Sequence, residues 1–273
     1  ILWNINFENP TCITVGPDDC VYYAGQTSTA LRLTKVNKSG NIIWDKYLTR
    51  APDSPYNFSY IAVSSDNTAL YIIQINQIII RWPITTNTWL IKIDPSDGDE
   101  IWAIDLLAQY GESWSDVLGL TADNKVLVTG YGKVYCFNPD STLKWVTSSF
   151  SEYYNKKFLT RDNDGMLYIS NGQYIWKCNP SDGSLTQIHE VTDEEITSMC
   201  MDKSKRIYYG SSYLYGDECY VRCIDSSDGS IIWEATSPVS DDAIALAICE
   251  GHLFVATGNY ISGPTGLLCY APP

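Results

Sequence analysis

Acidic and aromatic side chains recur together in the loops that we expect to lead into the first strand of each repeat of this chain. Aromatic faces offer apolar contact and attract cations, and carboxylates accept oriented hydrogen bonds. This combination suits a sugar, a polyol, a cationic ligand or a basic peptide. Because loops are polar in any case, the pattern also fits loops without a ligand. The residues that we expect to bind are Tyr60, Trp114, Asp116, Tyr154, Lys156, Glu195 and Asp242.

The sequence gives less support for catalysis. Its two histidines, His189 and His252, fall at different places in the repeat, and neither lies where these loops converge. We find no Ser-His-Asp or Cys-His unit and therefore predict no catalytic residue. A hydrolase or lactonase that uses a central metal held by the loop carboxylates is the enzymatic alternative.

Two further patterns bear on metal binding. Residues 162–165, Asp-Asn-Asp-Gly, resemble the start of a calcium loop. A polar turn occurs at the same place in every repeat, which favours a hairpin turn, so we predict no metal ligand and leave calcium open. The nine cysteines lack metal-ligand spacing and fit small buried residues of strands. Disulfide bonds are the alternative, and the candidate pairs are Cys12–Cys20, Cys219–Cys223 and Cys249–Cys269.

A short phrase repeated along the chain determines where these loops lie. It consists of an apolar strand, an acidic or amide turn that ends in Gly, and a short strand with Trp, and its cleanest copy spans residues 90–102. The phrase occurs five times, with Ser141 in place of Gly in one copy and Gln187 in place of Trp in another. A second phrase, of two strands joined by a polar turn, occurs six times. Periods of about 40–50 residues are typical of β-propellers.

The repeats predict an all-β fold, a six-bladed β-propeller with four antiparallel strands in each blade. The last repeat lacks its Gly and Trp, and residues 1–7 match the missing outer strand. From Trp233 across the chain ends to Trp3 is 43 residues, as between internal repeats. We therefore expect the N-terminal strand to complete the last blade, which removes an exposed sheet edge. The blades of this single domain, residues 1–273, are expected at 8–49, 50–107, 108–149, 150–191, 192–237, and 238–273 with 1–7.

The Asp-x-x-x-Gly-x-x-x-Trp pattern resembles the repeat of the PQQ-like, or quinoprotein-type, propellers over essentially the whole chain. In that family the tryptophan of the outer strand docks against the neighbouring blade. The resemblance implies this structural role for Trp3, Trp44, Trp102, Trp145 and Trp233. Members that oxidise alcohols with PQQ have eight blades, a pair of adjacent cysteines and a bound calcium. This chain has six repeats and no adjacent cysteines, so the resemblance does not extend to that site and we expect no PQQ.

Composition limits the partners. The chain carries 32 acidic and 18 basic residues, a net charge of −14, and lacks the basic surface that nucleic-acid binding requires. No apolar run is long enough to cross a bilayer, so we expect no membrane insertion. The chain begins at Ile within a required strand, as after removal of a leader peptide or trimming. We expect a secreted, periplasmic or extracellular protein.

One interval between repeats is longer than the others and contains an apolar insertion, Gln74–Thr88. If exposed, its Ile78, Ile80 and Trp82 would form a contact surface for a partner; alternatively, the insertion lengthens two strands. Our first hypothesis is a non-catalytic propeller that binds a carbohydrate, a cationic ligand or a protein through the acidic, aromatic-rich loops. The alternatives are the metal-dependent enzyme and a scaffold or assembly subunit that contacts its partner through this insertion.

Overall fold

The computed structural model describes most of the chain. The described residues are 10–27, 30–48, 56–78, 85–111, 117–130, 132–150, 158–213, 219–236, 242–249, 251–259 and 263–271. They form two compact units, Ile1–Trp145 (unit 1) and Val146–Pro273 (unit 2).

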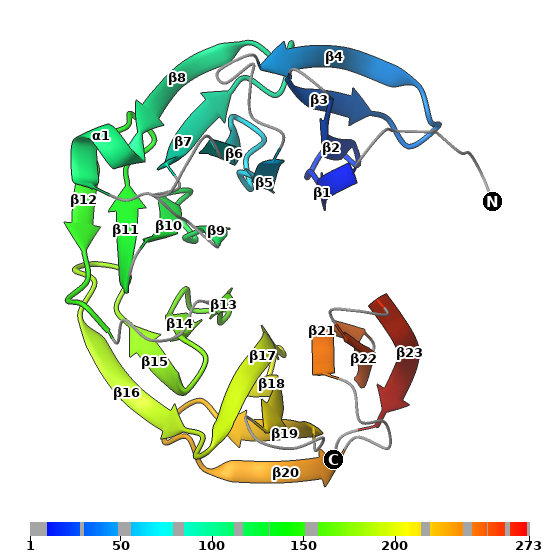
Figure 1. The fold of residues 1–273 in the computed structure, drawn as a ribbon, viewed down its shortest axis with the longest axis vertical. Coiled ribbons are helices and arrows are strands. Elements are labelled where there is room, and N and C mark those ends of the chain that lie inside the picture. Colours follow the sequence, from blue (N-terminus) through cyan, green and yellow to red (C-terminus); the bar gives the residue numbers. More distant parts are fainter. Residues whose placement is uncertain are drawn as a thin grey trace. The chain divides into compact units, whose positions relative to one another are not determined.

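Unit 1 contains three four-stranded antiparallel sheets, in each of which consecutive strands are neighbours (Figure 1). The first sheet consists of β1 (Pro10–Val15), β2 (Val21–Gln26), β3 (Leu31–Val36) and β4 (Ile42–Leu48). The second consists of β5 (Tyr56–Val63), β6 (Leu70–Ile78), β7 (Thr85–Ile93) and β8 (Glu100–Asp105). The third consists of β9 (Leu118–Leu120), β10 (Val126–Gly130), β11 (Lys133–Phe137) and β12 (Leu143–Val146), which ends at the unit boundary.

Unit 2 repeats the same meander. One sheet consists of β13 (Phe158–Arg161), β14 (Leu167–Ser170), β15 (Tyr174–Cys178) and β16 (Leu185–Glu190). The next consists of β17 (Glu194–Met201), β18 (Arg206–Tyr213), β19 (Cys219–Asp225) and β20 (Ile231–Thr236). The last has three described strands, β21 (Asp242–Cys249), β22 (His252–Asn259) and β23 (Gly263–Tyr270). Residues 1–7, expected as its fourth strand, lie outside the described part of the chain.

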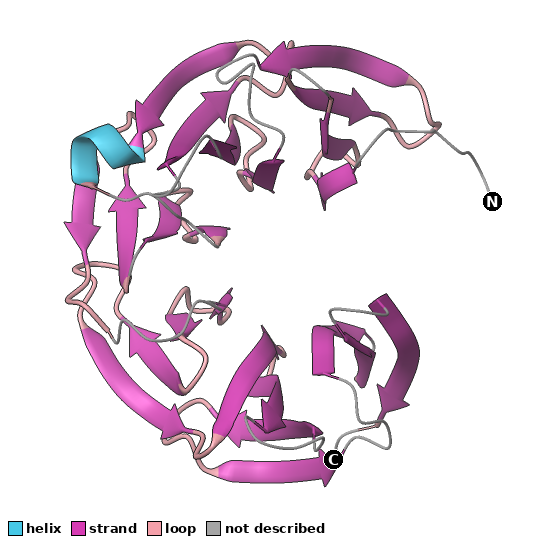
Figure 2. Cartoon of the chain, viewed as in Figure 1, coloured by secondary structure: helices cyan, strands magenta, loops and turns pink. Residues whose placement is uncertain are grey.

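Six antiparallel sheets match the six repeats, and the all-β fold is consistent with a propeller (Figure 2). The described chain contains one short helix, α1 (Leu106–Tyr110), besides its strands. Asp105 caps its N-terminus by accepting a hydrogen bond from Ala108 N at 3.0 Å, and Gly111 ends it with φ 73°. Its five residues are too few to show helical periodicity in the sequence.

The turns between the third and fourth strands explain the repeated Gly. The backbone there enters the left-handed region, which disfavours side chains other than Gly, Asn and Asp. In five sheets the residue with positive φ, between 74° and 84°, is Gly or its stand-in: Gly40, Gly98, Ser141, Gly183 and Gly229. At Gly98 an added Cβ would lie 2.9 Å from the ring of Trp44, so the turn also packs on the preceding sheet.

Apolar cores lie between consecutive sheets within each unit. In unit 1 the inner strand β5 packs against both β1 and β9, and in unit 2 β17 packs against both β13 and β21. Buried side chains from neighbouring sheets share one cluster, as Leu33 does with Ile72 and Cys223 with Val255. A sheet can bury both faces only against neighbours, so each repeat needs the next one to be stable.

Candidate functional site

Most of the predicted binding residues lie outside the described residues. Trp114, Asp116, Tyr154 and Lys156 belong to this group, as do Ile80 and Trp82 of the insertion. Asp242 begins β21 and Ile78 ends β6, but their side chains are not described. Only Tyr60 and Glu195 have described side chains, and they belong to different units.

Tyr60 and Glu195 are both partly buried and lie on the first strands of their sheets, β5 and β17. Tyr60 lies opposite Ile73 in the β5–β6 ladder and packs against the core cluster that contains Ile73 and Val128. Glu195 lies opposite Ser212 in the β17–β18 ladder. Binding by either side chain stays a prediction.

The neighbour of Glu195, Glu194, forms the most deeply buried ion pair in unit 2 among the described residues. Its carboxylate accepts two hydrogen bonds from the guanidinium of Arg222, one of them 2.9 Å long, and each side chain is 10% exposed. Ser211 Oγ also donates to Glu194, at 2.5 Å, and Arg222 Nε donates to Glu234. These residues, the Glu194 network, come from all four strands of one sheet, β17 to β20.

The electrostatics of the Glu194 network favour its charged form. Burial alone would raise the pKa of Glu194, but the hydrogen bonds from Arg222 and Ser211 hold it below its usual value. The guanidinium of Arg222 also lies 4.4 Å from the ring centroid of Tyr220 and 5.9 Å from that of Tyr209. A charge pair satisfied in this way fixes the geometry of the sheet and is costly to break.

His189 on β16 connects this sheet to the preceding one. Its Nδ1 lies 2.9 Å from the carbonyl oxygen of Gly229 and its Nε2 lies 2.7 Å from the hydroxyl of Tyr209. Since the carbonyl can only accept, Nδ1 carries the proton and Nε2 accepts from Tyr209. Burial lowers the pKa of His189, although the hydrogen bond to Gly229 opposes this shift. The histidine is therefore neutral and structural.

The sequence contained a signal for the Glu194 network that the repeat pattern alone did not use. Arg222 lies opposite Tyr209, at the third-strand position where Ile91 lies opposite Ile72 and Trp176 lies opposite Ile169. A charged residue in a row of large apolar ones indicates a buried ion pair. His189 similarly lies two residues after Gln187, the residue that replaces the repeated Trp.

The tryptophans contact neighbouring sheets through a recurring device. Trp44 Nε1 donates to Pro95 O at 3.0 Å, and Trp102 Nε1 donates to Pro139 O at 3.1 Å. Lys35 and Lys92, the cross-strand partners of these tryptophans, donate to the same two carbonyls at 2.9 Å.

The other three tryptophans of the predicted set differ in what is described. Trp233 packs edge-on against Tyr270, with ring centroids 5.4 Å apart. Trp145 is buried, and Trp3 lies outside the described residues.

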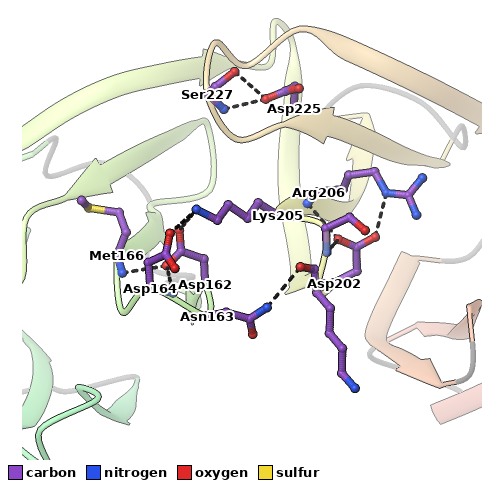
Figure 3. A network of polar contacts seen from close by, with 11 residues as sticks. Asp162, Asn163, Asp164, Met166, Asp202, Lys205, Arg206, Asp225 and Ser227 are labelled. Atoms are coloured by element: carbon purple, nitrogen blue, oxygen red, sulfur yellow. Dashed lines mark hydrogen bonds and ion pairs between the residues drawn. The ribbon is translucent and has the colours of Figure 1, made fainter.

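The Asp-Asn-Asp-Gly turn is occupied by a lysine (Figure 3). Asp162 Oδ1 accepts hydrogen bonds from the backbone nitrogens of Asp164 and Met166, both at 2.9 Å. The ammonium of Lys205, from the next sheet, pairs with Asp164 and lies 3.8 Å from Asp162 Oδ2. The geometry is that of a hairpin turn tied to the neighbouring sheet by ion pairs with Lys205.

Three other expectations can be compared with the described residues. Cys12, Cys20, Cys219, Cys223 and Cys269 are free thiols, so the candidate pairs Cys12–Cys20, Cys219–Cys223 and Cys249–Cys269 are wrong. The first four are buried or half-buried, so they pack as small side chains. The insertion lengthens two strands, with Ile75 buried opposite Thr88, while residues 79–84 lie outside the described chain. No three His, Cys, Asp or Glu side chains gather as metal ligands within the described ranges.

None of the described helices is long and apolar enough to span a membrane.

Comparison with solved structures shows similarity in fold. A protein from Lactobacillus plantarum is 16% identical with a TM-score of 0.65, over 92% of this chain and 78% of that one. The dihydro-heme d1 dehydrogenase NirN is 12% identical with a TM-score of 0.59, over 91% of this chain and 52% of that one. The extracellular domain of a hybrid two-component system from B. thetaiotaomicron is 13% identical with a TM-score of 0.53, over 97% of this chain and 40% of that one.

Comparison with curated proteins returned no match. A family model described as outer membrane protein assembly factor BamB, PQQ_2, matches residues 86–262. This match covers more than half of the sequence and agrees with the repeat that the tryptophans and turn glycines define. The chain therefore belongs to the PQQ_2 family of BamB-like repeat proteins.

Proposed function

We propose that this chain is a non-catalytic binding propeller that recognises a protein partner, a cationic ligand or a glycan through the loops that lead into its innermost strands. The observation that carries the proposal is membership in a family described as an assembly factor, since assembly of other proteins requires binding them. The proposed contact residues are Tyr60, Trp114, Asp116, Tyr154, Lys156, Glu195 and Asp242.

The described framework supports a binding role for the loops. The strongly interacting charged groups of unit 2 pair with one another, as Arg222 does with Glu194 and Arg206 with Asp202. Such pairs stabilise the sheets. In repeat folds, stable sheets usually position loops that bind the partner. Acidic loops would favour basic partners.

We further propose that residues 1–7 complete the last sheet and close a six-bladed ring with the blade boundaries given above. A location outside the cytoplasm goes with this proposal. It is supported by the family description, which refers to the outer membrane, and by similarity to an extracellular domain.

The proposal is tested by titrating the chain with a hexalysine peptide and with a glycan array, using variants of the loops. Asp116→Asn should weaken peptide binding about threefold to tenfold, because one carboxylate in an ion pair with a basic peptide contributes roughly 1 kcal/mol. Trp114→Ala should abolish glycan binding with the melting temperature unchanged.

The matched control is Asp19→Asn, which removes one carboxylate from an exposed turn at the opposite end of the sheets and keeps a residue that tolerates its φ of 56°. It should leave binding intact. Equal affinities for wild type, Asp116→Asn and Trp114→Ala would refute the proposed face, and a wild type that binds neither probe would refute both ligand classes.

A further inference from the structure

The turns between the first and second strands share one left-handed position. In all six sheets the third residue of this turn, or its equivalent, has φ between 56° and 86°: Asp19, Asn67, Asn124, Gly165, Lys205 and Gly251. The repeat makes these positions equivalent, so their side chains can be compared directly.

Three of these side chains reach back to the preceding sheet of the same unit. Asn67 Oδ1 accepts from the Tyr22 hydroxyl at 3.2 Å and its Nδ2 donates to Asp18 at 3.1 Å. Asn124 Oδ1 accepts from the backbone nitrogen and hydroxyl of Ser65, both at 3.0 Å. Lys205 pairs with the acidic turn of β13–β14, as Figure 3 shows. In each case the side chain connects two neighbouring hairpins by polar contacts.

The equivalent position in the last sheet is glycine. Cys249 pairs with His252, so the β21–β22 turn has only two residues, and Gly251 has φ 78° with nothing within 4 Å of an added Cβ. A pocket of about 400 Å³ lies between this turn and the β17–β18 hairpin. Its volume falls in the range of small-molecule sites. The pocket is present where the bridging side chain is missing.

The lining of the pocket combines positive charge with an apolar wall. The β17–β18 hairpin lines the pocket with Met201, Asp202, Lys203, Ser204, Arg206 and Tyr208. The β21–β22 hairpin lines it with Ile248 and Gly251. Asp202 already accepts from Arg206 Nε at 2.7 Å and from the Tyr208 hydroxyl at 3.3 Å, and Figure 3 shows the first of these contacts. Among the described lining residues, Lys203 and Arg206 are cationic and Asp202 is the carboxylate, which Arg206 and Tyr208 already engage.

We propose that this pocket binds a small organic anion, with its carboxylate or phosphate group at Arg206, Lys203 and Ser204 and a short apolar body against Met201 and Ile248. Guanidinium, ammonium and hydroxyl groups donate to such anions, and hydrogen bonds to charged groups are the stronger ones. A cationic ligand would meet two like charges. The site lies at the turns between first and second strands and is independent of the loops assigned to partner binding above.

Four probes with the same six-carbon body test the chemistry: hexanoate, hexyl phosphate, hexylammonium and hexanol, titrated by ligand-observed NMR. Hexanoate or hexyl phosphate should bind at least about tenfold more tightly than hexylammonium and hexanol, since hydrogen bonds to charged groups exceed neutral ones. Preference for one anion identifies the head group. Binding should weaken as salt is added, because ions screen the attraction between the bound anion and the exposed ammonium of Lys203.

Gly251→Asn is the decisive variant, because Asn already occupies the same left-handed position in two other sheets, at Asn67 and Asn124. Its side chain should occupy the part of the pocket next to residue 251 and weaken anion binding at least about tenfold. The matched control is Gly111→Asn, at φ 73° with nothing within 4 Å of an added Cβ, which should leave binding unchanged. Lys203→Gln, at an exposed position, should weaken anion binding about threefold to tenfold without affecting folding.

The results that overturn the proposal are distinct. They are equal affinity for hexylammonium, no binding of either anion up to millimolar concentration, or wild-type affinity in both folded variants, Gly251→Asn and Lys203→Gln. Should Gly251→Asn fail to fold, the Lys203→Gln titration decides alone.

Discussion

Two contacts between neighbouring sheets use the same register positions with different side chains. In unit 1 the cross-strand row Tyr22, Lys35 and Trp44 faces the next sheet, and Lys35 and Trp44 both donate to Pro95 O. In unit 2 the equivalent row contains Tyr208, Cys223 and Trp233.

The unit 2 row contacts its neighbour through apolar surface. Cys223 packs in a core cluster with Leu253 and Val255, and Trp233 packs on Tyr270. Where unit 1 has the ammonium of Lys35, unit 2 has the thiol of Cys223, so an apolar contact replaces a hydrogen bond. The repeat fixes where two sheets meet, and the side chains at a few register positions decide whether the contact is polar, apolar or, at Gly251, open.

The largest loss of stability is expected from breaking the buried ion pair between Glu194 and Arg222 in unit 2. Glu194→Ala leaves Arg222 without its main partner at a site that is 10% exposed, and should lower the free energy of unfolding by about 3–5 kcal/mol. Arg32→Gln in unit 1 is the comparison, since Arg32 pairs with Asp45 at a site about a quarter exposed and should cost about 1 kcal/mol. Chemical denaturation measures both, and equal losses would show that burial does not separate the two pairs.

A smaller loss of stability is expected from replacing Lys35, whose ammonium donates a hydrogen bond to Pro95 of the next sheet in unit 1. Lys35→Met removes a donor to Pro95 and the partner of Asp18, whose carboxylate lies 2.8 Å from the ammonium. Burial alone would raise the pKa of Asp18, but Lys35 and the backbone nitrogen of Cys20 lower it to about 2. The substitution should cost about 2 kcal/mol.

Lys92→Met is the control for this tie, because Lys92 makes the equivalent bond to Pro139 at an exposed site and should cost less than about 1 kcal/mol. The Lys35→Met loss should also shrink at acidic pH, as Asp18 becomes protonated. A loss that is the same at pH 7 and pH 2 would contradict the ion pair as its source.

The arrangement of the sheets could be predicted from the sequence because each repeat must bury its faces against the next. The Gly and Trp spacing therefore predicted the sheets and the turns that end at Gly40 and Gly98, where the structure shows positive φ. It did not predict which of two adjacent acids is buried, since Glu194 and Glu195 point to opposite faces of β17 and a shift of one residue exchanges them. The pocket beside Gly251 escaped prediction because it arises from a side chain that is missing.

The smallest effect concerns pH. Burial keeps the pKa of His189 below 6.5, so the unfolded chain binds more protons than the folded one just below this pH. Its contribution to stability is complete above pH 6.5 and is lost as the pH falls toward the lower pKa of the folded state. Equilibrium unfolding between pH 7 and pH 5 should therefore show a slope that His189→Gln reduces and His252→Gln, at an exposed site, retains. An unchanged slope in His189→Gln would show that His189 does not cause the pH dependence of stability.

The most direct test of the equivalence of the repeats concerns the last sheet. In two of the described sheets, a residue of the third strand lies opposite the tryptophan of the fourth strand. These pairs are Lys35 with Trp44 and Cys223 with Trp233. Phe254 lies opposite Cys269 in the same row, so a fourth strand formed by residues 1–7 would bring position 3 opposite Cys269. Cross-strand neighbours are within disulfide distance.

Trp3→Cys should therefore form a disulfide bond with Cys269 under mild oxidation, identified by peptide mapping with mass spectrometry, just as Trp233→Cys should with Cys223. A Trp3→Cys variant that leaves Cys269 reduced, while Trp233→Cys is cross-linked, would contradict the assignment of residues 1–7 to the last sheet.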